Sequence, residues 1–319
     1  MTAIDLQARE YGIHSLDSGY VRPRLDAIHL IVHEGRAAFV DTGTGHSVPL
    51  MLAALAHLGL EVDAVDYVIL THVHLDHAGG AGRLMQHLPR ARLVVHPRGA
   101  PHMIAPAKLW AATVAVYGEE RARHDYGELV PVARERVTEA TDGFAVELAG
   151  RRLSFLDTPG HARHHICVHD HHAHALFTGD TFGLSYRELD RGGRAFIFPT
   201  TTPTQFDPEA LRASVDRVLA CSPRAIYLTH YSEITDIARL GADLHRLIDA
   251  HETLGLQWAQ CDDRAQREAG LTAGVHRIVV DEARRSGSDE ALWVETFVND
   301  IPLNAQGLGA WLDYRNKTV

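Results

Sequence analysis

Cysteine is scarce in this sequence, and its placement argues against a disulfide-stapled fold. The 319 residues include three cysteines, Cys167, Cys221 and Cys261, which lie far apart and form no C-x-x-C pair. An odd number at such spacings does not make a disulfide framework. Long apolar runs are also missing: no segment reaches the length of a membrane span. The N-terminal stretch MTAIDLQARE has no basic segment leading into an apolar run, as a signal peptide would. We therefore expect a soluble, cytoplasmic protein without a membrane partner.

Positive charge is in deficit as well. The chain has 31 Lys and Arg against 41 Asp and Glu, which gives a formal net charge of -10. Nucleic acid usually selects a basic patch on its protein partner. The charge balance therefore argues against nucleic acid, and the expected partner is a small-molecule substrate.

The sequence does show the alternation of short strands and helices that is typical of an α/β protein. The segment from about 98 to 137 has mixed helical character and is expected to lie over a site. A tail with a helical pattern suggests two domains, 1–254 and a C-terminal extension, 255–319. Strands are expected in 28–40 (two, around Glu34–Gly35), 65–70, 93–95, 153–157, 165–169, 174–178 and 225–228. Helices are expected over 48–58 (capped by Ser47), 78–88, 208–220 (capped by Asp207), 235–252, 271–285 and 290–298.

One turn concentrates side chains that bind metals. The segment THVHLDHAGG, residues 71–80, follows an apolar run and holds three histidines and one aspartate. The chain has 23 histidines, so a chance cluster has to be weighed against a metal site. Three later strand-like segments also end in such residues, and strand ends are where a rigid scaffold presents chemistry. This repetition favours the metal site. The residues are His72, His74, Asp76 and His77 in the turn, His161 after LSFLDTPG, Asp180 after ALFTG and His230 after AIYLT.

Five imidazoles and two carboxylates form a ligand set with a clear metal preference. Such a mixture suits borderline divalent metals, whereas calcium and magnesium prefer shells made of oxygen. We expect two divalent metal ions, with zinc preferred and iron or manganese as alternatives. Two cations that share a water lower its pKa from about 16 towards about 7, which produces a hydroxide at neutral pH. The set therefore suits hydrolysis.

The same residues resemble the metallo-β-lactamase superfamily. Residues 72–77 match its hallmark H-x-H-x-D-H letter for letter, and DTG at 41–43 is also similar to the family. The resemblance covers about residues 10–250 and implies an αββα sandwich, in which two mixed sheets pack face to face with helices outside. It also implies a dinuclear centre: His72, His74 and His161 hold the first metal, Asp76, His77 and His230 hold the second, and Asp180 bridges the two.

Further roles are expected for the ligand Asp76 and for three residues outside the ligand set. Asp76 is expected to steer the attacking hydroxide as well as to bind metal, which makes it the expected catalytic residue. Asp41 either accepts the free N–H of a ligating imidazole or only fixes the DTG turn. His165 and Tyr231, which follow ligands in the sequence, either line the substrate pocket or pack in the core.

The leading hypothesis is a hydrolase that uses a metal-bridging hydroxide to cleave a small ester, thioester or lactone. It resembles the group that includes glyoxalase II-like enzymes and the quinolone-signal thioesterase. Lactonases of the superfamily commonly carry tyrosine three residues after the bridging aspartate, where this chain has Gly183, although Tyr186 lies nearby. Two alternatives stay open: a diiron redox or oxygen-binding protein, and a ligand-binding signalling module with little turnover. The apolar residues of the tail are expected to pack beside the metal cleft or to form a homodimer contact.

Overall fold

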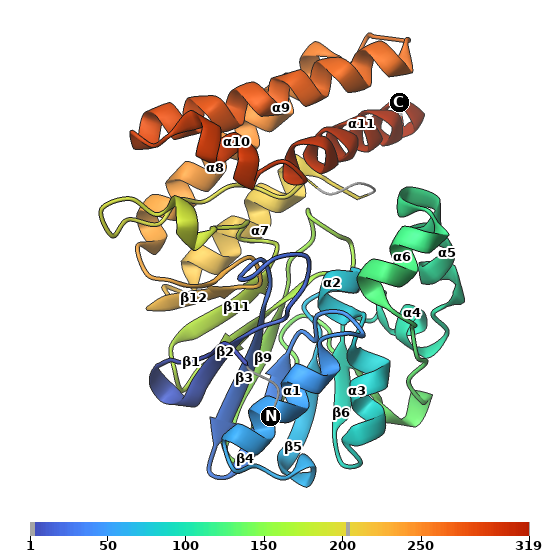
Figure 1. The fold of residues 1–319 in the computed structure, drawn as a ribbon, viewed down its shortest axis with the longest axis vertical. Coiled ribbons are helices and arrows are strands. Elements are labelled where there is room, and N and C mark those ends of the chain that lie inside the picture. The colour runs from blue at the N-terminus through green and yellow to red at the C-terminus, as the bar shows by residue number, and fades with distance from the viewer. Residues whose placement is uncertain (1–3, 202–204, 319) are drawn as a thin grey trace. The chain divides into compact units, whose positions relative to one another are not determined.

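The computed structural model describes residues 4–201 and 205–318, and the chain divides into two compact units (Figure 1). The first unit comprises Met1–Asp157, His164–Gly179 and Pro223–Thr235. The second comprises Thr158–Arg163, Asp180–Ser222 and Asp236–Val319. The domain boundary expected at 254 lies inside helix α8 (Ile237–Gln257), and the division into 1–254 and 255–319 stays a prediction.

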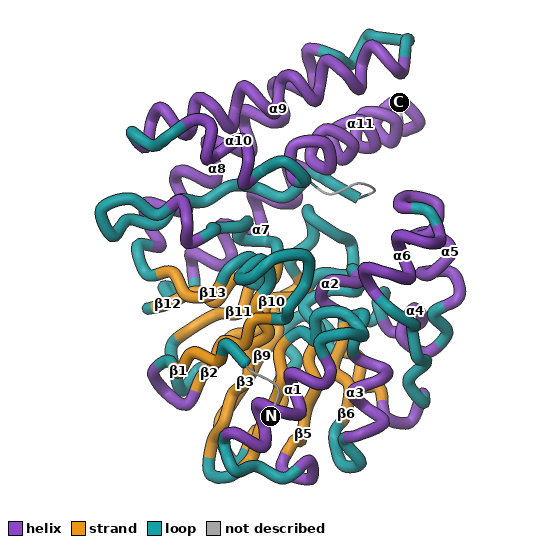
Figure 2. The backbone as a smooth tube through the Cα atoms, viewed as in Figure 1, coloured by secondary structure: helices purple, strands orange, loops and turns teal. Residues whose placement is uncertain are grey.

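Both sheets belong to the first unit. Figure 2 draws their strands in orange. In the seven-stranded sheet, called sheet A, the strands follow one another in chain order; neighbours from β1 to β4 are antiparallel and those from β4 to β7 are parallel. Its strands are β1 (Leu6–Ala8), β2 (Ile13–Asp17), β3 (Ala27–His33), β4 (Arg36–Val40), β5 (Val65–Ile69), β6 (Arg92–Val95) and β7 (Val137–Glu139).

The six-stranded sheet, called sheet B, has the order β13-β12-β11-β10-β9-β8. Its strands pair antiparallel except for β11 and β12, which are parallel. Sheet B is therefore mixed, like sheet A. Its strands are β8 (Ala145–Leu148), β9 (Arg151–Asp157), β10 (Ile166–Asp170), β11 (Ala175–Gly179), β12 (Ala225–Leu228) and β13 (Ser232–Ile234).

Alternation along the strands of sheet A builds two cores. Ile31, Val40 and Ile69 share one apolar cluster with Phe155, Phe177 and other residues of sheet B. Their chain neighbours Leu30, Phe39 and Val68 join a second cluster with residues of α1 (Val48–His57) and α3 (Ala81–His87). Successive side chains of a strand point to opposite faces, so one row packs against sheet B and the other against the helices. The first unit thus has three layers: helices, sheet A and sheet B.

The remaining helices of the first unit lie around the histidine-rich turn. The turn itself forms α2 (Leu75–Ala78). The segment of mixed helical character forms α4 (Ala100–Ile104), α5 (Ala107–Tyr117) and α6 (Glu119–Tyr126). Tyr126 on α6 shares a small apolar cluster with Leu75 on α2. This contact places the segment against the turn.

The glycines that follow the turn permit close backbone contact. A Cβ atom on Gly80 would lie 2.7 Å from the carbonyl oxygens of both Thr42 and Thr44, and one on Gly82 would lie 1.7 Å from that of Val130. Any side chain at these positions would push the neighbouring loops apart. These glycines therefore allow the neighbouring loops to pack closely.

The second unit is helical. Its core contains an aromatic cluster in which the ring centroids of Phe196 and Trp293 are 4.7 Å apart and those of Phe198 and Phe297 are 4.8 Å apart. Trp293 and Phe297 are fully buried, so these two apolar residues of the tail form a core. The helices are α7 (Pro208–Ala220), α8, α9 (Arg264–Ser286), α10 (Glu290–Thr296) and α11 (Asp300–Thr318).

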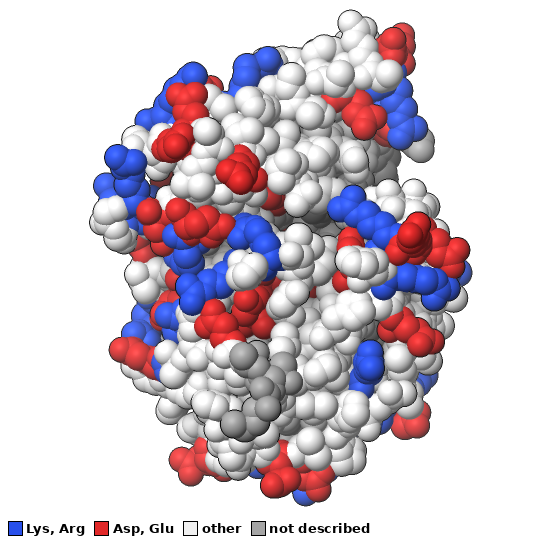
Figure 3. Space-filling view, in the orientation of Figure 1, with Lys and Arg blue, Asp and Glu red and all other residues white. Residues whose placement is uncertain are grey.

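The expected fold class, an α/β protein with two mixed sheets and a helical C-terminal region, is confirmed. Within the described residues, no helix has the length and apolar character needed to cross a membrane. On the face drawn in Figure 3, basic and acidic side chains of the described residues lie intermixed.

Candidate metal centre

The histidine-rich turn begins where β5 ends. Leu70 and Thr71 leave the strand, and His72 is fully buried. His74 occupies the position before α2 with extended backbone, at φ -66° and ψ 150°, and Asp76 and His77 lie in the first turn of that helix. The sharp change from strand to helix lets closely spaced side chains point into one region.

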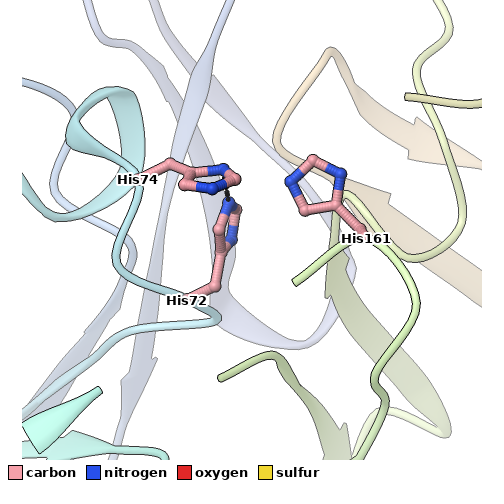
Figure 4. Close-up of side chains that lie close together, drawn as sticks. All are labelled: His72, His74 and His161. Atoms are coloured by element: carbon pink, nitrogen blue, oxygen red, sulfur yellow. Dashed lines mark hydrogen bonds between the residues drawn. The ribbon is translucent and has the colours of Figure 1, made fainter. Parts of the chain in front are cut away.

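His72 and His74 face each other through nitrogen atoms. Nε2 of His72 lies 2.9 Å from Nδ1 of His74 (Figure 4). The other ring nitrogen of His72, Nδ1, lies 3.2 Å from the hydroxyl of Thr71. When Nδ1–H donates to that hydroxyl, the lone pair of His72 is on Nε2, toward His74. His161, also labelled in Figure 4, belongs to the second unit.

A second group in the same unit consists of Asp76, His77 and His230. Each offers one ligand atom, and these three atoms lie within 4.8 Å of one another. Nε2 of His77 is 3.7 Å from Oδ2 of Asp76, and Nε2 of His230 is 3.8 Å from the same oxygen. His230 follows β12 of sheet B, whereas the other two follow β5 of sheet A. The group therefore joins strand ends from both sheets.

Asp41 forms a hydrogen bond with Nδ1 of His77, the ring nitrogen that faces away from Asp76. Its Oδ2 lies 2.8 Å from Nδ1 of His77 and accepts a hydrogen bond from the hydroxyl of Thr229 at 2.9 Å. Its Oδ1 accepts the backbone N–H of Thr71 at 2.8 Å. Asp41 thus does both things that the sequence left open: it contacts an imidazole of the turn and also fixes the loops around it. An Nδ1–H donated to Asp41 leaves the lone pair of His77 on Nε2.

Asp26 lies against the corresponding ring nitrogen of His230. Its Oδ1 lies 2.8 Å from Nδ1 of His230, and its side chain is 1% exposed. Burial raises the pKa of the Asp26 carboxyl to about 6, although the neighbouring His230 opposes the rise. Sequence analysis missed this residue because Asp26 belongs to no motif and lies far from His230 in the chain. The signal in the sequence was an acidic residue directly before an apolar strand.

His161 and Asp180 lie together in the second unit. Nε2 of His161 is 3.4 Å from Oδ2 of Asp180, and both side chains are buried. Nδ1 of His161 lies 3.1 Å from the carbonyl oxygen of Thr200 and 2.9 Å from its hydroxyl. An Nδ1–H donated to Thr200 again leaves the lone pair on Nε2, toward Asp180.

The two further pocket residues suggested by the sequence are both buried. His165 is stacked on His72, with ring centroids 4.9 Å apart and an interplanar angle of 24°. Tyr231 is 1% exposed, and its hydroxyl has no hydrogen-bond partner within the described residues. Burial raises the pKa of Tyr231 to about 12. His165 thus packs against the imidazole ring of His72. Tyr231 lies in the protein interior.

The donor chemistry of these residues fits divalent metals. Imidazole nitrogens and carboxylate oxygens are the ligands of zinc and of other borderline metals. Four histidines, His72, His77, His161 and His230, are fixed on Nδ1 and present Nε2, which is how ligating histidines are usually held. The residues present therefore fit a metal-binding role, although the assignment of each ligand stays a prediction.

Comparisons with known proteins agree with the fold and the motif. Residues 22–230, more than half of the chain, match the metallo-beta-lactamase superfamily. A metallo-beta-lactamase fold-containing protein of Sulfurisphaera tokodaii is 28% identical over 226 residues, which cover 69% of this chain and 78% of that protein. A hydroxyacylglutathione hydrolase of Stenotrophomonas maltophilia is 36% identical over 164 residues. That match covers 51% of this chain and 48% of the relative, so the chain spans about half the relative's length.

A solved structure shows the same fold. The metallo-beta-lactamase family protein of Thermus thermophilus superposes with a TM-score of 0.66 at 21% identity, covering 96% of this chain and 94% of that one. At this identity the likeness concerns the fold alone. The family match, the two mixed sheets and the H-x-H-x-D-H turn after β5 lead to one conclusion. The chain belongs to the metallo-β-lactamase superfamily.

Proposed function

We propose that this protein is a dinuclear metal-dependent hydrolase that cleaves a small ester, thioester or lactone. The observation that carries the proposal is the convergence of Asp76, His77 and His230, whose ligand atoms lie within 4.8 Å of one another. Both imidazoles are held on Nδ1 by a buried carboxylate. A histidine cluster that served packing alone would not need its Nε2 atoms aimed at a carboxylate.

The proposed metal ligands are those implied by the family hallmark. His72, His74 and His161 would hold one metal, Asp76, His77 and His230 the other, and Asp180 both. The pairing of His161 with Asp180 in the second unit, with Nε2 aimed at Oδ2, supports their joint use. When bound, the metals would polarise a water molecule and stabilise the negative charge that develops on the substrate oxygen.

The protein side chains have tasks of their own in this proposal. Asp76 is 24% exposed, more than the two imidazoles around it, so its carboxylate can both bind metal and orient the attacking water. Asp41 and Asp26 fix the two imidazoles and contribute negative charge that favours a bound cation. Rigid ligands of this kind hold the reacting groups in place before substrate arrives.

The surroundings of Gly183 and Tyr186 support a choice among the proposed substrates. Gly183 has φ +75°, and a Cβ atom there would lie 2.3 Å from the carbonyl oxygen of Phe198. A tyrosine therefore does not fit at this position without rebuilding the loop. Tyr186 is buried and donates its hydroxyl to the carboxylate of Asp300 at 3.1 Å. Neither residue is arranged to serve as the tyrosine of a lactonase, which favours an ester or thioester over a lactone.

The comparisons support the same preference. Several relatives, at 26–36% identity, are named hydroxyacylglutathione hydrolases, so their names describe hydrolysis of an acyl conjugate. We propose a substrate of the same broad kind, a small acyl ester or thioester, for this chain.

The experiment that tests the function compares metals on one substrate panel. Metal-stripped protein is loaded with zinc, manganese or iron and assayed on an aryl ester, an aryl thioester and a lactone, with oxygen uptake recorded in parallel. We expect two metals per chain and hydrolysis with zinc or manganese, since a redox-inert ion is sufficient for Lewis-acid chemistry. Asp76→Asn is expected to lower the rate about 100-fold or more, because it weakens a ligand and water orientation together.

A matched control is His124→Gln, because the side chain of His124 is 87% exposed. It is expected to keep the metal content and the rate of the wild type. Activity with iron alone, accompanied by oxygen uptake, would replace the hydrolase with the diiron alternative. Metal binding without turnover on any substrate would favour the signalling module.

A further inference from the structure

Asp26 is a buried carboxylate with unusually few partners. It lies just before β3 and is 1% exposed. Its close partner is Nδ1 of His230, at 2.8 Å from Oδ1, and the same nitrogen lies 3.3 Å from the carbonyl oxygen of Leu25. Within the described residues, neither carboxylate oxygen of Asp26 receives a hydrogen bond of good geometry. The ion-pair contact with His230 is therefore its main compensation.

Two other buried aspartates show what full compensation looks like in this fold. Asp170 pairs with the guanidinium of Arg151 and also accepts the backbone N–H groups of His172 and Ala173 at 3.1 and 3.2 Å. Asp41 accepts bonds from Thr71, Thr229 and His77. Burying an ionised carboxylate is destabilising unless partners replace the lost water. Asp26 has fewer such partners than Asp41 or Asp170, with His230 as its one close charged contact among the described residues.

The geometry around His230 indicates a role for the Asp26 carboxylate. Nδ1 of His230 has two acceptors beside it, Oδ1 of Asp26 and the carbonyl oxygen of Leu25, so Nδ1 carries the hydrogen. The lone pair is then on Nε2, the atom 3.8 Å from Oδ2 of Asp76. The ring is thus fixed in both rotation and tautomer. A positive charge that reaches the ring through Nε2 would supply the compensation that Asp26 lacks.

We propose that Asp26 is a positioning residue for metal binding, which orients His230 and strengthens the metal position formed with Asp76 and His77. The inference rests on the proposed function, since it concerns the same pair of metals. Asp26 differs from Asp41 in one respect that makes it testable. Asp41 also joins several loops through hydrogen bonds, whereas the carboxylate of Asp26 has His230 as its one close charged contact among the described residues. Substitution of Asp26 can therefore change metal binding without a comparable effect on folding.

The test measures zinc binding rather than turnover. The full chain is stripped with a chelator and titrated with zinc by calorimetry, in the wild type and in Asp26→Ala, Asp26→Asn and His230→Ala. We expect the wild type to bind two zinc ions and Asp26→Ala to bind one of them about 10- to 100-fold more weakly. Asp26→Asn retains an acceptor oxygen and should lose less affinity. The other zinc should bind as in the wild type.

A double-mutant cycle shows whether Asp26 acts through His230. If it does, Asp26→Ala has no further effect on zinc binding in a His230→Ala background, because the group it orients is gone. The matched control is Asp17→Asn. Asp17 is the last residue of β2, at the start of the loop that leads to Asp26, and accepts the backbone N–H groups of Gly19 and Arg24 at 3.1 and 3.0 Å. The control therefore alters this loop without a hydrogen bond to His230.

The outcomes separate this inference from the proposed function. A wild type that binds fewer than two zinc ions would overturn the dinuclear site and the inference together. A wild type that binds two, with Asp26→Ala binding both equally well, would overturn the inference alone. It would also be overturned if Asp26→Ala weakened both zinc ions equally and lowered the melting temperature of the metal-free protein, since that result describes a structural residue.

Discussion

Asp41 shows how much of this fold depends on one side chain. Its carboxylate accepts bonds from Thr71 after β5, from Thr229 after β12 and from His77 on α2. Its own backbone is left-handed, with φ 60°, a conformation that aspartate tolerates better than most residues. A carboxylate can accept several bonds at once, which explains why this residue type ends β4.

Replacing Asp41 should therefore be costly. Asp41→Ala leaves the buried N–H of Thr71 and the hydroxyl of Thr229 without their acceptor, and we expect the free energy of unfolding to fall by about 3 kcal/mol or more. Urea unfolding of the metal-free protein measures it. The control, Asp66→Ala, removes a partly exposed ion pair with Arg36 and should cost less than about 1 kcal/mol. Equal losses in the two variants would contradict the central role of Asp41.

Sequence analysis found Asp41 and missed Asp26 for a physical reason. Asp41 stands in a DTG stretch at the end of an apolar run, where local pattern alone suggests a turn next to a site. Asp26 acts on His230, which the fold brings to it from more than 200 positions away. Contacts between residues so far apart in the sequence arise because sheet A packs against sheet B. The spacing of neighbouring residues carries no information about them.

At the level of secondary structure, helix capping separates local from tertiary effects. The sequence predicts capping side chains at Ser47 and Asp207. Asp207 accepts the backbone N–H of Ala210 at 3.0 Å, which confirms its cap. Ser47 does occupy the cap position before α1, but its hydroxyl donates to the carbonyl oxygen of Ser18 at 2.7 Å and makes no capping bond to the helix. Tertiary contact with the 18–20 loop has displaced the local bond.

The cap at Asp207 can be tested directly. Asp207→Ala should lower the free energy of unfolding by about 1 kcal/mol, because an N–H at the start of α7 loses its acceptor. Asp207→Asn keeps an acceptor oxygen and should stay within about 0.5 kcal/mol of the wild type. Unfolding is followed by tryptophan fluorescence. If the alanine variant matched the asparagine variant, the cap would contribute nothing to stability.

Helix α11 shows why some elements escape prediction. Its sequence includes Pro302, Gly307 and Gly309, which lower helix propensity. A Cβ atom on Gly307 would lie 1.2 Å from the carbonyl oxygen of Thr201, so only glycine allows this packing. Asn304 adds a hydrogen bond from the N–H of Thr201 to its side chain at 2.6 Å. Gly307, which weakens the helix locally, is thus also the residue that lets it pack closely against Thr201.

Across the whole molecule, the fold class and the strand-end placement of the proposed ligands could be predicted, whereas the short strands could not. The motif residues follow β5, β9, β11 and β12; β11 and β12 are buried throughout, and β5 and β9 also carry buried apolar residues. Strands β1, β7 and β13 have three residues each, too few to show an alternating pattern. Each pairs with one neighbouring strand, which supplies the hydrogen bonds that hold it in the sheet.

Buried histidines make the stability of the whole molecule depend on pH. His29 in the first unit and His251 in the second are both fully buried, and burial lowers the pKa of each to about 4. In the unfolded chain their pKa returns to the ordinary value of 6.5. Below pH 6.5 the unfolded state therefore binds protons that the folded state does not bind, so stability falls as the pH is lowered from about 6.5 towards 4.

His251 allows this effect to be isolated. Its Nδ1 lies 2.7 Å from the carbonyl oxygen of Leu247, and its Nε2 has no partner within the described residues. His251→Leu removes the titrating group and keeps a buried apolar side chain in α8. Between pH 7.5 and 5.5 the wild type should lose about 1.3 kcal/mol more stability than the variant, because one proton is taken up on unfolding. Urea unfolding of the metal-free proteins, followed by tryptophan fluorescence, measures the difference, and Trp258, Trp293 and Trp311 report on the second unit. Stability curves that stay parallel over this pH range would show that His251 does not contribute to the acid sensitivity.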